Sequence, residues 1–149
     1  MFLEWRQAMG NFNTQEVMCE IRQKIAEQQK ENDSFIHPNK YYEKMLGQMK
    51  EQESLIIFGA GKYGEVLSQD LKLREINTVQ CFCDNKINTK YVNGLEVLSP
   101  QEAIERFPNA CYVITPRNYE NEIVRQLIHL GVTIDDIIIL NVKNTGLLS

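Results

Sequence analysis

The chain has 149 residues, of which 43% are apolar and 24% charged, and its formal net charge is −4. This length and composition are typical of one globular domain that is large enough to bury a core. The net negative charge argues against a general nucleic-acid surface, which needs clustered lysine and arginine to neutralise phosphates. No apolar run approaches the length of a membrane span, and charges interrupt the first residues where a signal peptide would be apolar. We therefore expect a cytoplasmic protein with no membrane insertion and no nucleic-acid partner.

The first 53 residues predict two helices, each with one apolar stripe. Asn13 to Glu16 resemble a capping box with Asn13 as N-cap, and the helix that follows fades from Gln28 onward. A second helix is expected from Pro38 to about Lys50. The two stripes consist of Val17, Met18, Ile21 and Ile25 in the first helix, and of Tyr41, Tyr42, Met45, Leu46 and Met49 in the second. Each stripe needs a partner, which is either the domain that follows or another copy of the chain in a homodimer. We interpret residues 1–53 as a packing or dimerisation segment.

The most informative stretch runs from Leu55 to Leu67, where an apolar run leads into a glycine turn and then into a helical pattern. A strand, a Gly-x-Gly-x-x-Gly turn and a helix, in that order, form the opening of a Rossmann-type βαβ unit. We expect Gly59 to permit the tight turn, Gly61 to let a pyrophosphate approach the backbone, and Gly64 to let the helix pack closely on its strand. The free N–H groups of the first helical turn then make a site for an anion.

An acidic residue stands where this type of site needs one. The second expected strand ends at Asp84, twenty residues beyond Gly64. A carboxylate there can accept hydrogen bonds from the ribose hydroxyls and would repel a 2′-phosphate, which favours NAD or another unphosphorylated ribose over NADP. The alternative is an α/β domain in which the glycine turn is kept for its geometry and binds nothing.

Strands and helices alternate from residue 54 onward, which predicts a parallel sheet covered on both faces. The expected strands are 55–58, 79–83, 94–98, 111–114 and 137–140, with a polar loop over 85–93. One helix begins with Ser99 as N-cap and Pro100 at the first helical position, and another runs from Tyr119 to Leu130 with Gly131 capping it. Right-handed crossovers give the strand order 3-2-1-4-5. The fold class is therefore an α/β Rossmann-like three-layer sandwich over 54–149, preceded by the helical segment 1–53.

This strand order predicts where a ligand binds. The winding reverses between the first and fourth strands, which leaves a crevice at their carboxyl ends. The glycine turn and the loop Thr115–Asn118 lie on its two sides, and Asp84 borders the same edge. Lys62 and Arg117 offer positive charge to a phosphate, and Tyr63 could cover a base or sugar, although each is also explained as a solvated side chain. The candidate cofactor-binding residues are Gly59, Ala60, Gly61, Lys62, Tyr63, Gly64, Asp84, Asn85, Thr115 and Arg117.

The cysteines and histidines suggest neither a metal site nor a catalytic group. Cys81 and Cys83 stand two apart on one expected strand, without the CxxC spacing of a zinc site. We interpret the cysteines as reduced, buried thiols that pack as small hydrophobes. Neither His37 nor His129 has an obvious serine, cysteine or acidic partner.

The stretches FGAGKYGEVL, FCDNK, NGLEVLSPQEA and YVIT, over about residues 54–140, resemble a bacterial Rossmann-like domain of polysaccharide biosynthesis proteins. Such domains occur in capsule-type nucleotide-sugar epimerases and dehydratases, in sugar acyltransferases and with FkbM-type methyltransferases. The resemblance implies that NAD or a nucleotide-sugar contacts Gly59, Gly61, Gly64 and Asp84, with Asn85 next to it. The larger catalytic domain of many relatives is not expected after residue 140, and no tyrosine is followed four residues later by lysine.

Three functions stay open at this point, and no catalytic residue is assigned. The first is a nucleotide-binding module in cell-surface polysaccharide or nucleotide-sugar metabolism, not clearly catalytic alone. The second is an NAD-dependent oxidoreductase or epimerase that acts on a nucleotide-sugar. The third is a non-catalytic regulatory or scaffold protein with a vestigial glycine turn.

Overall fold

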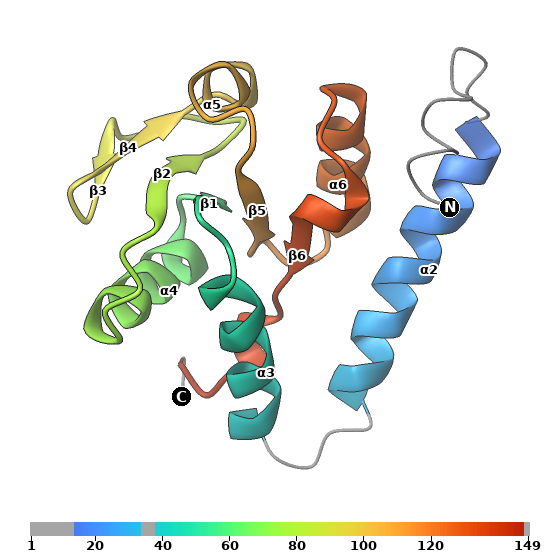
Figure 1. Cartoon of the computed structure of the whole chain (residues 1–149), viewed down its shortest axis with the longest axis horizontal. Helices are drawn as coiled ribbons and strands as arrows, with labels where there is room; N and C mark the ends of the chain where they lie inside the picture. The colour runs from blue at the N-terminus through green and yellow to red at the C-terminus, as the bar shows by residue number, and fades with distance from the viewer. Residues whose placement is uncertain (1–13, 34–37, 148–149) are drawn as a thin grey trace.

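A six-stranded sheet forms the centre of the protein (Figure 1). The computed structural model describes residues 14–33 and 38–147. The strands are β1 (Leu55–Phe58), β2 (Val79–Cys83), β3 (Tyr91–Val92), β4 (Leu95–Leu98), β5 (Cys111–Ile114) and β6 (Ile137–Ile139), and their order in the sheet is β3-β4-β2-β1-β5-β6. All neighbours pair in parallel except β3 and β4, which are antiparallel. The five predicted strands are therefore present in the predicted order.

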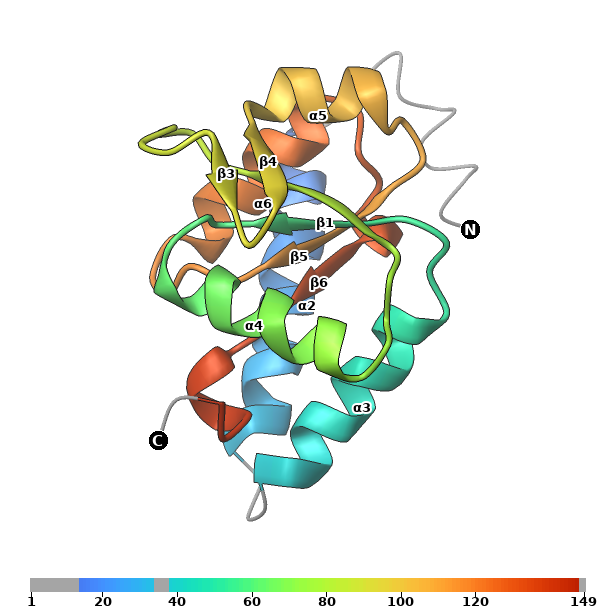
Figure 2. The same cartoon turned by 90° about the vertical axis from the view of Figure 1, so that its left-hand side faces the viewer.

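Within the described residues, five α-helices and two short 3-10 helices surround the sheet. The α-helices are α2 (Thr14–Asp33), α3 (Pro38–Lys50), α4 (Lys62–Leu73), α5 (Pro100–Arg106) and α6 (Glu120–His129), and the 3-10 helices are η2 (Ile134–Asp136) and η3 (Val142–Asn144). Because side chains alternate along a strand, β1 sends Ile56 and Phe58 to one face and Leu55 and Ile57 to the other. Helices α2, α5 and α6 lie on the first face, and helices α3 and α4 lie on the second (Figures 1 and 2). The arrangement is the predicted three-layer α/β sandwich.

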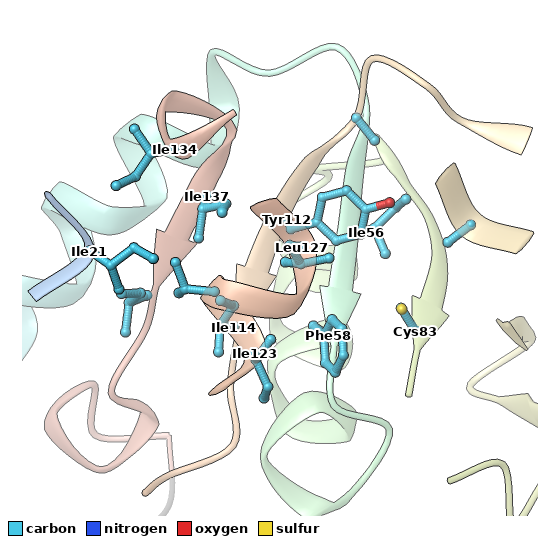
Figure 3. Packing of buried hydrophobic residues seen from close by; sticks show 14 of the residues in the cluster. Ile21, Ile56, Phe58, Cys83, Tyr112, Ile114, Ile123, Leu127, Ile134 and Ile137 are labelled. Atoms are coloured by element: carbon cyan, nitrogen blue, oxygen red, sulfur yellow. The ribbon is translucent and has the colours of Figure 1, made fainter. Parts of the chain in front are cut away.

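The apolar stripes of the two N-terminal helices are buried within the chain itself. On α2, Ile21 packs with Ile134 and Ile137 beside α6 (Figure 3). On α3, all five predicted stripe residues are buried in the cluster on the opposite face, and Tyr41 accepts a hydrogen bond from the Asn141 N–H at 3.0 Å. The stripes thus have partners without a second copy of the chain, and a homodimer through them stays a prediction. The division into a segment 1–53 and a domain 54–149 also stays a prediction.

Two details of the expected secondary structure were wrong, and a third lies outside the described residues. The loop predicted over 85–93 contains strand β3, which pairs with β4 through a tight turn at Asn93 and Gly94, with φ values of 51° and 81°. Helix α2 continues to Asp33 instead of fading at Gln28. The predicted N-cap Asn13 precedes the part of the chain that the structure describes.

Candidate functional site

The turn between β1 and α4 has the geometry that was expected for Gly59 and Gly64. Gly59 has φ +115°, which L-residues rarely adopt, and a Cβ there would lie 2.5 Å from Thr115 Oγ1. Its N–H donates to the Cys83 carbonyl at 2.8 Å, which ties the turn to β2. A Cβ on Gly64 would lie 1.9 Å from the Gly59 carbonyl oxygen, so only glycine lets α4 start this close to the turn.

Gly61 differs from these two glycines. Its φ of −86° is open to any residue, and a Cβ added there would meet no atom within 4 Å. Neither the backbone conformation nor the packing of the described chain requires glycine at this position. The open space in front of the Gly61 backbone is what a pyrophosphate cradle needs, because a side chain would fill it.

The start of α4 is open to a ligand. Gly61 is its N-cap and provides no side-chain cap, so the first N–H groups of the helix lack the usual hydroxyl or carboxylate acceptor. These N–H groups and the helix dipole together favour an anion. Figure 2 shows how β1 leads through the turn into α4, at the carboxyl ends of the central strands.

Asp84 holds the glycine turn in place. Its Oδ2 accepts a hydrogen bond from the Ala60 N–H at 2.9 Å, and its Oδ1 accepts one from the Lys86 N–H at 3.0 Å. The sequence predicted contacts with ribose and did not anticipate these bonds to the backbone. A carboxylate has about four acceptor positions, so roughly two remain for hydroxyl groups of a ligand. Asp84 is half-buried and borders the cleft, where such groups can reach it.

The predicted residues converge on one cleft of about 610 Å³, within the usual size range of small-molecule sites. It lies at the carboxyl ends of β1 and β5, where the winding of the sheet reverses. Nine of the ten candidate residues line it, and the tenth, Ala60, adjoins it through its bond to Asp84. The lining consists of Phe58, Gly59, Gly61, Lys62, Tyr63, Gly64, Asp84, Asn85, Lys86, Thr115, Pro116, Arg117, Tyr119, Glu122, Ile123 and Gln126.

The polar candidates in the cleft fall into two groups. Thr115 is 2% exposed, and its hydroxyl donates to the Phe58 carbonyl at 3.0 Å, so it supports the turn from within. Lys62 and Arg117 are exposed, and within the described ranges neither forms an ion pair. Both cations are therefore available to a ligand at the mouth of the cleft.

One wall of the cleft was not predicted from the sequence. Helix α6 and the residue before it contribute Tyr119, Glu122 and Gln126. The side-chain amides of Asn85 and Gln126 exchange two hydrogen bonds, at 2.9 and 2.7 Å, which join the loop after β2 to α6. The sequence did place this helix directly after the Thr115–Asn118 loop, which was a signal that it borders the cleft. The helix periodicity, however, predicted only that its apolar face packs on the sheet.

The expectation that the cysteines are buried holds for the three in the strands and is wrong for Cys19 on α2, which is exposed. Cys81, Cys83 and Cys111 are buried in the strands, and burial raises the pKa of the Cys81 thiol to about 12. Burial also raises the pKa of the Cys83 thiol, and the neighbouring Cys81 and Asp84 raise it further by smaller amounts. Over the described residues, no cluster of histidine, cysteine or acidic side chains is suited to a metal ion, and no helix has the length and apolar character of a membrane span.

Comparisons with known proteins relate the chain to a protein family and to solved structures. Residues 51–138, more than half of the chain, match the family model described as C2185-like, N-terminal. The curated proteins gave no significant match. The crystal structure of RSP, a Rex-family repressor, is similar at 18% identity with a TM-score of 0.49, and the alignment covers 68% of this chain and 58% of that one. The chain thus spans less than two thirds of that protein's length. Neither match names a polysaccharide biosynthesis protein, so that part of the sequence resemblance stays a prediction.

Proposed function

The chain belongs to the C2185-like, N-terminal family, and we propose that it binds the diphosphate of a nucleotide, either NAD or a nucleotide-sugar, at the start of α4. One observation carries the proposal: an uncapped helix start, a carboxylate and two unpaired cations meet in a single cleft at the switch point of the sheet. Gly61, Asp84, Lys62 and Arg117 supply these features.

The charges of the cleft support a diphosphate in particular. Lys62, Lys86 and Arg117 line it, against the two carboxylates of Asp84 and Glu122. The lining therefore carries one more positive than negative side chain, whereas the whole chain carries a net charge of −4. Together with the helix dipole, this local excess gives a phosphate group several favourable contacts.

Asp84 supports a ribose without a 2′-phosphate. One of its acceptor positions binds the glycine turn at Ala60 and another binds the Lys86 N–H in the loop after β2. The acceptor positions that remain suit the two hydroxyls of a ribose. A 2′-phosphate placed there would meet a carboxylate of the same sign, which favours NAD over NADP. A role in nucleotide-sugar or polysaccharide metabolism rests on the sequence resemblance, and it belongs to this proposal only as a prediction.

Isothermal titration calorimetry against NAD⁺, NADP⁺, UDP-glucose and S-adenosylmethionine tests the proposal. We expect NAD⁺ or UDP-glucose to bind, with NADP⁺ weaker than NAD⁺. Lys62→Ala and Arg117→Ala should each lower the affinity about fivefold, since one charge-assisted contact at an exposed site is worth about 1 kcal/mol. Lys50→Ala, which removes an exposed charge from the end of α3, is the control and should leave the affinity unchanged. Absence of heat with all four compounds would contradict the proposal.

A further inference from the structure

The reciprocal amide pair of Asn85 and Gln126 is the most distinctive polar feature of the cleft outside the glycine turn. The two residues lie 41 positions apart in the sequence and both line the cleft. Each amide donates one hydrogen bond to the other and accepts one from it. Each amide of the pair therefore fixes the orientation of the other.

Each amide keeps unused hydrogen-bonding capacity. A primary amide has two N–H donors and a carbonyl oxygen with two acceptor positions. The pair uses one donor and one acceptor position of each residue, so one N–H and one acceptor position remain on each. Asn85 is exposed and Gln126 is half-buried, so these groups are accessible to solvent or to a ligand.

The position of the pair follows the order of the parts of a nucleotide. The glycine turn at one end of the cleft suits the diphosphate, and Asp84, bonded to the turn through the Ala60 N–H, suits the ribose. Asn85 is the next residue along the chain, and it also lines the cleft. Phe58 and Ile123 pack in one core cluster (Figure 3) and both line the cleft, and Ile123 stands three positions before Gln126 on α6.

Resting on the proposed function, we propose that the Asn85–Gln126 pair recognises the base of the bound nucleotide. The free N–H and carbonyl of the amides bind the edge of the base, and the apolar surface of the cleft contacts its ring. A single asparagine or glutamine amide binds adenine through the edge that this pair already occupies. Here the free N–H of one amide and the free carbonyl acceptor position of its partner therefore bind the acceptor and the donor of the base. Uracil also carries a hydrogen-bond donor beside an acceptor. The experiment therefore compares an adenine nucleotide with a uracil nucleotide.

NMR titrations of the full chain with ADP, UDP and inorganic pyrophosphate test the inference. We expect the side-chain amide signals of Asn85 and Gln126 to shift with ADP or with UDP and to stay in place with pyrophosphate. Asn85→Ala and Gln126→Ala should lower the affinity for that nucleotide about tenfold, as expected for one or two lost hydrogen bonds, and leave the pyrophosphate affinity unchanged. Asn121→Ala, which removes an exposed amide of α6 outside the cleft lining, is the control and should change neither affinity.

The outcomes separate this inference from the proposed function. Equal losses of nucleotide and pyrophosphate affinity would show that the pair only positions the loop that carries Asp84, and unchanged nucleotide affinity in both variants would show that the base lies elsewhere. Either result overturns the inference and leaves diphosphate binding in place. If the parent protein binds neither nucleotide nor pyrophosphate, both the proposed function and the inference fail.

Discussion

Replacing Gly64 with alanine tests whether the close approach of α4 to the glycine turn shapes the cleft. The added Cβ would lie 1.9 Å from the Gly59 carbonyl oxygen and 3.3 Å from Cγ2 of Ile57. Even weakly bonded C···O pairs stay about 3.3 Å apart, so α4 or the turn must move by roughly 1 Å or more. The obstacle is backbone and has no rotamer by which to move aside. Overpacking of this kind costs about 1–3 kcal/mol or more, and the higher helix propensity of alanine offsets about 1 kcal/mol.

We therefore expect Gly64→Ala to lower the free energy of unfolding by about 2 kcal/mol, or the Tm by roughly 4–8 °C for a chain of this size. Urea and thermal unfolding followed by circular dichroism measure both quantities. Gly47→Ala is the matched control, because Gly47 lies exposed within α3 and a Cβ there meets no atom within 4 Å. That control should stabilise the protein by about 0.5–1 kcal/mol. Equal stability of Gly64→Ala and the parent would refute the reasoning.

Four further predictions concern the core, the thiols and the hairpin. The buried Tyr112 hydroxyl has no hydrogen-bond partner within the described chain, so Tyr112→Phe should be neutral or stabilising by up to about 2 kcal/mol in urea unfolding; a loss above about 1 kcal/mol would reveal a partner. Burial raises the thiol pKa of Cys81 and Cys111 from 9.0 to about 12. The unfolded chain therefore loses these protons first, and unfolding measured against pH should show stability falling as the pH rises from about 9 to about 12. A thiol reagent at neutral pH should modify the exposed Cys19 while the buried thiols stay protected, and rapid labelling of all four would count against this packing. Asn93 Nδ2 donates to the Glu65 carbonyl at 3.1 Å and to Ser68 Oγ at 2.8 Å, and Asn93 has φ +51°. Asn93→Ala should therefore lower the free energy of unfolding by about 2 kcal/mol. An unchanged urea midpoint would show that the hairpin does not depend on this residue.

Much of the fold could be predicted because its signals are local. The run Leu55–Phe58 followed by the glycine turn specifies a buried strand and a helix without reference to any distant residue. Ser99 was predicted as an N-cap from its spacing to Glu102, and its hydroxyl does accept the Glu102 N–H at 3.3 Å. The order of the parallel strands then follows from right-handed crossovers.

The β3–β4 hairpin was missed although its signal is present in the sequence. Asn93-Gly94 is the dipeptide that favours a two-residue hairpin turn with positive φ at both positions. Polar residues around it suggested a loop, and β3 has only two residues, so its alternation of side chains is too short to recognise. The side chain of Asn93 also fixes the hairpin to α4, a contact that depends on the tertiary structure.

The α6 wall of the cleft could not be predicted for a different reason. The bonds between Asn85 and Gln126 join residues far apart in the sequence. Asn85 was a candidate because it follows Asp84, but no local pattern marks Gln126 as part of a site. The same holds for Asp84, because its motif predicts a ribose contact and says nothing of the Ala60 N–H that it binds. Residues placed by local geometry were predictable, whereas residues that meet only through packing were not.

The Gly61→Val variant tests the central claim, that the start of α4 is a diphosphate cradle, most directly. The structure separates folding from binding at this position, since Gly61 has an ordinary φ of −86° and open space around its Cβ position. The unfolding free energy should therefore stay within about 1 kcal/mol of the parent, while calorimetric affinity for NAD⁺ or UDP-glucose falls at least about tenfold because the valine occupies the phosphate position. A folded Gly61→Val protein that binds the same ligand as tightly as the parent would contradict the account.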